Sequence, residues 1–151
     1  MVRLASCQIA DFCGWKSRDF FDRTPQRARS FLPPEITLLE NQELDFEGIR
    51  FCSVVARPYL KNEVQTSENV DFLITHTPIK CVLDEGIGCP YLRSLVIRCN
   101  PKFHIFGHIH SQGLQRFEGK YTTFCNVSYF NHLRDAYIHE LTQNAQDFFK
   151  K

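Results

Sequence analysis

The sequence predicts an α/β fold built around a layered sheet. Short apolar runs with polar turns between them dominate the second half, and a single segment between two such runs has apolar residues at helical spacing. A strand, a helix and another strand in that order are typical of a sheet with a helix packed on it. Antiparallel strands expected after them keep the α+β class open as an alternative. The 151 residues suit one domain.

The first half begins with an irregular stretch, residues 1–34, in which Thr24 and Pro25 can begin a short helix that Pro33 and Pro34 end. Apolar and polar residues then alternate, which predicts β structure with a turn at Glu47-Gly48. Three runs have this character: residues 36–38, 44–46 and 49–56. The polar residues 57–69 are expected to form a loop.

The second half supplies the layered unit. A continuous apolar run at residues 72–74 predicts a buried strand, and Pro90 can open a helix that Asn100-Pro101 ends. The buried stripe of this helix is expected to be Leu92, Leu95, Val96 and Cys99. Further strands are expected at 103–106, at 121–126 as the return of a hairpin bracketed by Gly113 and Gly119, and at 135–141, before a weak terminal helix at 143–151.

Composition excludes several classes of partner and location. The 18 Lys and Arg against 17 Asp and Glu give a net charge of +1, so neither bulk nucleic acid nor an anionic membrane is an expected partner. No apolar run approaches the roughly 18–20 residues of a membrane helix, and the first residues lack a secretory signal. Seven cysteines without a C-x-x-C pair indicate free thiols in a reducing, cytoplasmic compartment.

Three histidines are candidate metal ligands. His76 follows the strand at 72–74, and His108 and His110 follow the strand at 103–106, with Gly107 between strand and ligands. Strand carboxyl ends are where layered α/β sheets carry ligand sites. Neutral imidazoles suit Zn, Fe or Mn ions.

A single histidine is more often a hydrogen-bonded structural residue than a ligand. We interpret His104, His132 and His139 as structural residues of this kind. For His76 together with the Gly107–His110 motif, the pattern favours the functional interpretation.

The motifs around these histidines resemble those of the calcineurin-like metallophosphoesterases. Residues 72–78, FLITHTP, resemble the family segment D-(apolar)₃-T-H-(G/T)-P, and residues 106–110, FGHIH, resemble its final G-H-x-H motif. Residues 83–84, 88–90 and 101–104 look like the branch that contains the brain-type and cyclic-nucleotide phosphodiesterase-like members. Residues 38–51 are similar to the family's preceding strand pair, and residues 122–128 match its following strand. The resemblance covers about residues 24–140.

The resemblance implies a double-sheet sandwich flanked by helices that hydrolyses phosphodiester or phosphomonoester bonds with two divalent cations. His76 and His108 would bind the second metal and His110 the first. The family motifs D-x-H and G-D-x-x-D are absent ahead of residue 36, and G-N-H-D/E is absent before Thr24. The chain therefore looks like the C-terminal half of the fold, with the N-terminal half missing. The expected division is an irregular segment at 1–23, a partial domain at 24–141 and a tail at 142–151.

Three imidazoles carry no negative charge to offset the repulsion of two dications, so at most one metal is expected. Three functions stay open: a phosphoesterase whose site is completed elsewhere, an inactive remnant that binds a partner chain through an exposed sheet, and a mononuclear zinc protein. No catalytic residue is assigned. The expected substrate of the first is a phosphate ester.

Overall fold

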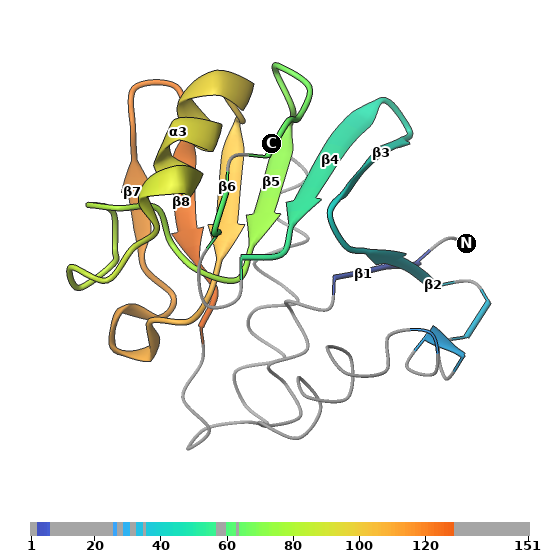
Figure 1. Ribbon diagram of the computed structural model, residues 1–151, viewed down its shortest axis with the longest axis horizontal. Coiled ribbons are helices and arrows are strands. Elements are labelled where there is room, and N and C mark those ends of the chain that lie inside the picture. Colours follow the sequence, from blue (N-terminus) through green and yellow to red (C-terminus); the bar gives the residue numbers. More distant parts are fainter. Residues whose placement is uncertain are drawn as a thin grey trace.

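The computed structural model describes residues 3–6, 26, 29–30, 33–34, 36–56, 60–62 and 64–128, and shows an α/β-type fold (Figure 1). The strands are β1 (Arg3–Ser6), β2 (Ile36–Leu39), β3 (Gln42–Phe46), β4 (Ile49–Val54), β5 (Phe72–Thr75), β6 (Phe103–Phe106), β7 (Arg116–Glu118) and β8 (Thr123–Asn126). The helices whose bounds the structure describes are α3 (Pro90–Cys99) and the short 3₁₀ turn η2 (His110–Gln112).

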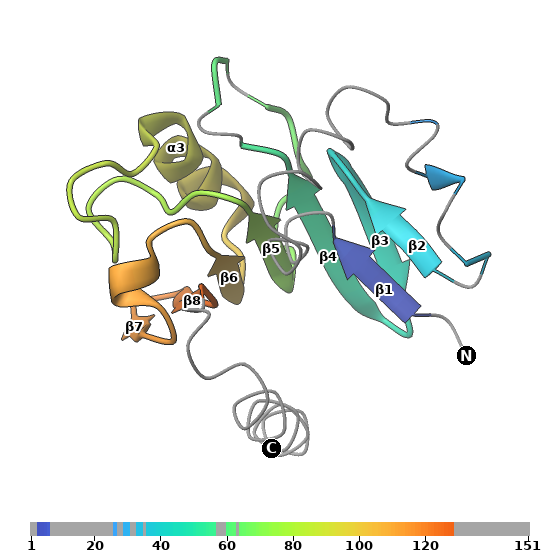
Figure 2. The same cartoon turned by 90° about the horizontal axis from the view of Figure 1, so that it is seen from below.

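The main sheet has six strands in the order β3-β4-β5-β6-β8-β7. Its four inner strands run parallel, and β3 and β7 are antiparallel to their neighbours at the two edges. Strands β1 and β2 form a separate parallel pair, in register from Arg3 with Ile36 to Ser6 with Leu39. Figures 1 and 2 show α3 lying across one face of the sheet, over its inner strands.

Helix α3 forms where the sequence predicts it and buries the expected stripe. Pro90 stands in its first turn and Asn100 ends it in the left-handed region, with φ of 43°. The buried side chains are Leu92, Leu95, Val96 and Cys99, as predicted. They pack in one core cluster with residues of all four inner strands: Cys52, Val54, Leu73, Phe106 and Phe124.

The opposite face of the inner strands is also apolar. Phe51, Phe72 and Phe103 stand on neighbouring strands, with ring centroids 5.2 and 5.1 Å apart and planes inclined by only 13° and 16°. Parallel strands are usually buried on both faces and therefore read as continuous apolar runs. This explains why every residue of β5 is buried.

Most strand predictions are confirmed, with small shifts of the ends. The turn between β3 and β4 has positive φ at Glu47 (50°) and Gly48 (79°), which matches the right-handed twist of a hairpin. Strand β4 ends at Val54 rather than 56, and β8 begins at Thr123 rather than 121. The strand predicted at 135–141, the tail at 143–151 and most of the helix after Thr24 lie outside the described residues.

Strand β1 falls in the stretch that was expected to be irregular. Its partner β2 lies more than thirty positions later in the chain, so the sequence contains no local turn or repeated alternation that would predict this pair of strands. None of the described helices is long and apolar enough to cross a membrane.

His104 lies inside β6 and is a structural residue, as predicted. It is 0% exposed, and its Nε2 lies 2.8 Å from Oγ1 of Thr75 on the neighbouring strand. The Thr75 hydroxyl donates its proton to the carbonyl of Thr77 at 2.7 Å. The Nε2–H of His104 is therefore the donor in the contact between His104 and Thr75. Burial lowers the pKa of His104 to about 3, which keeps the ring neutral.

We predict that His104 makes the fold sensitive to mild acid. Its pKa falls from 6.5 to about 3 on folding, so the unfolded chain takes up a proton first and stability falls as pH drops below 6.5. The loss approaches about 1.4 kcal/mol per pH unit. Urea unfolding of the wild type and His104→Gln between pH 7 and 4.5 checks this. Parallel curves for the two proteins would refute it.

Candidate metal centre

The topology brings two of the three predicted ligands together. Strands β5 and β6 are parallel neighbours, with Phe72 opposite Phe103, so both end at the same edge of the sheet. His76 comes directly after β5, and His108 follows β6 by two residues. Their ring centroids lie 5.0 Å apart and the ring planes are inclined by 59°.

His76 sits in a turn that hydrogen bonds fix on both sides. Its side chain is 4% exposed. Before it, the Thr75 hydroxyl closes the turn onto the Thr77 carbonyl, and after it the Thr77 hydroxyl donates to the carbonyl of Ala56 at 2.9 Å. The N–H of Cys89 donates to Pro78 at 2.9 Å and ties the turn to the start of α3. These bonds leave the backbone that carries the His76 imidazole little freedom to move.

His108 is the central residue of a γ-turn with positive φ. Its φ is 73°, and the Ile109 N–H donates to the carbonyl of Gly107 at 2.9 Å. Such turns are rare, and a non-glycine residue in this region costs on the order of 1–3 kcal/mol. The N–H of Gly107 donates to the His76 carbonyl at 3.0 Å, so the two histidine turns are bonded directly to each other. Backbone strain of this kind clusters at ligand sites.

His110 occupies a different environment from the other two. It is exposed and begins η2, where its carbonyl accepts the N–H of Gly113 at 3.0 Å. Within the described ranges, no group of three or more His, Cys, Asp or Glu side chains could hold a metal ion. In the described part of the chain, the imidazoles of His76 and His108 lie together, and no third His, Cys, Asp or Glu completes a group that could hold a metal ion.

Both acidic residues of the neighbouring loop, Asp84 and Glu85, accept hydrogen bonds. Asp84 is buried, and one of its oxygens accepts the N–H groups of Cys81 and Gly88, each at 3.0 Å. Burial alone would raise the pKa of Asp84, but these backbone N–H groups outweigh it and hold the pKa below its ordinary value. A Cβ on Gly88 would lie 2.2 Å from the Ile79 carbonyl, so only glycine fits there. The carboxylate of Glu85 accepts a hydrogen bond from the hydroxyl of Ser111, the residue that follows His110.

Sequence reasoning missed the contribution of Asn126. The triplet Asn126-Val127-Ser128 matches a glycosylation sequon, but the Asn126 side chain is 1% exposed and hydrogen-bonded on both sides. A modification enzyme could not reach it in the folded chain. The sequence feature that could have identified Asn126 is its position at the carboxyl end of a strand, at the sheet edge where the histidines also lie.

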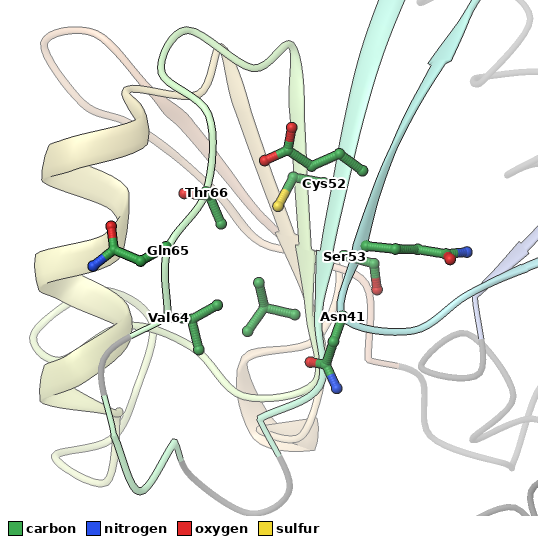
Figure 3. A pocket seen from close by; sticks show the side chains of 9 residues that line it. Asn41, Cys52, Ser53, Val64, Gln65 and Thr66 are labelled. Atoms are coloured by element: carbon green, nitrogen blue, oxygen red, sulfur yellow. The ribbon is translucent and has the colours of Figure 1, made fainter.

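A pocket of about 300 Å³ lies elsewhere, between the β3–β4 hairpin and the segment 64–66 (Figure 3). None of the three predicted histidines lines it. Burial, with a smaller contribution from Glu43, raises the pKa of the Cys52 thiol in its wall to about 12. A thiol with so high a pKa is a poor nucleophile, so this pocket is no candidate for cysteine chemistry. Its lining residues are Asn41, Gln42, Glu43, Cys52, Ser53, Val54, Val64, Gln65 and Thr66.

We predict that His108→Gly unfolds at a higher denaturant concentration than His108→Ala. Both variants remove the imidazole, but only alanine keeps the cost of a positive φ, which amounts to about 1 kcal/mol. Urea unfolding of the metal-free proteins measures the difference. Equal stability of the two variants would mean that the backbone does not hold this φ in solution.

Comparison with known proteins adds two relatives. No family model matches the chain. It is 32% identical over 113 residues to the UPF0046 protein K07C11.7 of Caenorhabditis elegans, a match that covers 64% of this chain and 39% of that protein. It is 38% identical over 84 residues to the UPF0046 protein C25E10.12 of the same organism, covering 48% of this chain and 30% of that protein. The chain thus spans well under half the length of the curated relatives that it matches.

Proposed function

We propose that this chain carries the histidine side of a metal-dependent phosphoesterase site. One divalent cation (Zn, Mn or Fe) would be held between His76 and His108. The observation that carries the proposal is the approach of these two rings to 5.0 Å from two turns at one sheet edge. Hydrolysis of phosphodiester or phosphomonoester bonds would follow where the remaining ligands are present.

The chemistry of the donor set supports one cation rather than two. A bound divalent cation polarises a phosphoryl oxygen and lowers the pKa of a coordinated water. The chain's own contribution is orientation: the turns of His76 and His108 are fixed by backbone hydrogen bonds before any ligand arrives. Such preorganisation reduces the entropy lost on binding. Without a bridging carboxylate, a second cation would meet only repulsion.

We also propose that the sheet is half of a metallophosphoesterase-type sandwich. Support comes from the face opposite α3, where Phe51, Phe72 and Phe103 form a stacked row on three parallel strands. A second layer packed on that row would meet the requirement that parallel strands be covered on both faces. The relatives extend well beyond the matched part, and we assign the carboxylate ligands to that additional length.

A second candidate function is non-catalytic binding of a partner chain through the same row of phenylalanines. Phe51 and Phe103 are only half-buried, so part of this apolar surface is in contact with solvent. Aromatic surface of this kind is enriched in the cores of protein interfaces. In this case a metal between the two histidines would have a structural role.

We predict that the purified chain binds one equivalent of Zn²⁺ or Mn²⁺ or less, measured by calorimetric titration. His108→Gly should lose the metal, because it removes one of two imidazoles while keeping the backbone conformation. Ser111→Ala is the matched control, since it removes an exposed polar side chain three positions away. Metal retained by His108→Gly would remove His108 from the site. Two tightly bound ions would contradict the prediction and would show that the chain contains metal ligands besides His76 and His108.

Phosphodiester hydrolysis by the isolated chain should be weak or absent. The reason is the incomplete ligand set, which leaves no second cation to stabilise the leaving oxygen. Release of nitrophenol from bis(4-nitrophenyl) phosphate, with and without a chelator, measures it. Chelator-sensitive turnover in the ordinary enzymatic range, about 1–10³ per second, would contradict a partial site.

A further inference from the structure

A buried asparagine holds the turn that carries His108. The side-chain amide of Asn126 donates from Nδ2 to the carbonyl of Ile109 at 2.8 Å. Its Oδ1 accepts the N–H of Ser128 at 2.9 Å. Because an N–H needs an acceptor and a carbonyl needs a donor, these two partners fix the orientation of the amide. Neither partner belongs to a strand, so the amide stabilises the loop rather than the sheet.

The backbone around Asn126 also forms hydrogen bonds to the two ends of the loop that carries His108. The N–H of Leu114 donates to the Asn126 carbonyl at 2.7 Å, and the N–H of Val127 donates to Phe106 at 2.7 Å. A Cβ on Gly113 would lie 2.3 Å from the carbonyl oxygen of Ser128, so the two backbone segments are in direct contact. The loop from 107 to 114 is therefore closed over the end of β8.

The Asn126 amide acts at the point where the strained turn ends. Ile109 is the third residue of the γ-turn centred on His108, and its side chain is buried. On the other side, Gly107 is bonded to the His76 carbonyl. The γ-turn is thus held at its first residue by the His76 turn and at its third residue by Asn126. Relaxation of the positive φ at His108 would have to break one of these bonds.

We propose that Asn126 is a positioning residue for His108: it holds the γ-turn that keeps the His108 ring beside that of His76. The proposal rests on the proposed metal site, in which this ring pair binds the cation. Partners that orient a metal ligand typically change metal affinity by about 10–100-fold when they are removed.

The experiment compares Asn126→Ala with Thr122→Val. Thr122 is buried just before the other end of β8, and its hydroxyl donates to the Pro101 carbonyl at 2.7 Å. Each variant removes side-chain-to-backbone hydrogen bonding from a buried site, but only Asn126 contacts the His108 loop. In a Zn²⁺ titration, Asn126→Ala should weaken binding about 10–100-fold, whereas Thr122→Val should bind as the wild type does. Equal losses in the two variants would overturn the positioning role.

Metal-free protein gives an independent readout. The nuclear Overhauser contact between the His76 and His108 rings should be present in the wild type and in Thr122→Val, and lost in Asn126→Ala. A contact that persists in Asn126→Ala overturns the proposal, whatever the wild type binds. If the wild type shows the contact and binds no Zn²⁺, the proposed function fails while the role of Asn126 stands or falls on the contact alone.

One further variant covers the case in which Asn126→Ala does not fold, and a double variant gives a stability readout where it does fold. Asn126→Asp retains an acceptor for the Ser128 N–H but sets a carboxylate oxygen against the Ile109 carbonyl, so it replaces the bond to Ile109 with a repulsive contact and should also lose the ring contact. Asn126→Ala in the His108→Gly background should lower the midpoint of thermal unfolding by less than in the wild type, because glycine adopts the turn without strain. The same shift in both backgrounds would show a structural role only.

Discussion

The hydrogen bond from the Gly107 N–H to the His76 carbonyl is the contact on which the candidate site depends. It joins the turn after β5 to the turn after β6, at 3.0 Å. The bond exists because the two strands are parallel neighbours and end at one edge of the sheet. Reversing either strand would send its histidine to the opposite end. The ring pair is therefore a consequence of topology before it is a consequence of local sequence.

Buried polar side chains then fix what the topology brings together. Thr75 and Thr77 close the turn of His76, and Asn126 closes that of His108. Each of these residues lies in a strand or within two positions of its end, and each bonds to loop backbone. A buried hydrogen bond lost from one side leaves an unsatisfied partner, at a cost of about 1–3 kcal/mol. That cost is comparable with the strain of the γ-turn, so the strained conformation can persist.

The sequence predicted the elements whose signals are local. Helix α3 and strand β6 appear at the predicted residues because Pro90, the apolar stripe and Asn100-Pro101 act within a few positions of one another. Strand β1 could not be predicted, since its described partner β2 is distant in the chain. The pairing of His76 with His108 followed from the motifs and the strand-end rule. The γ-turn at His108 and the amide of Asn126 did not, because they depend on contacts across three strands.

The electrostatics of the ring pair decide what a complete site must contain. Two divalent cations 4 Å apart repel each other by about 16 kcal/mol at an effective dielectric constant near 20. Imidazole ligands such as those of His76 and His108 carry no negative charge and so offset none of this repulsion, whereas a bridging carboxylate attracts both ions. The carboxylate of Asp84 is already engaged by the N–H groups of Cys81 and Gly88. A two-metal phosphoesterase site at this sheet edge would therefore need negative charge from residues beyond the described loops, since no group of three or more His, Cys, Asp or Glu side chains within the described part could hold a metal ion.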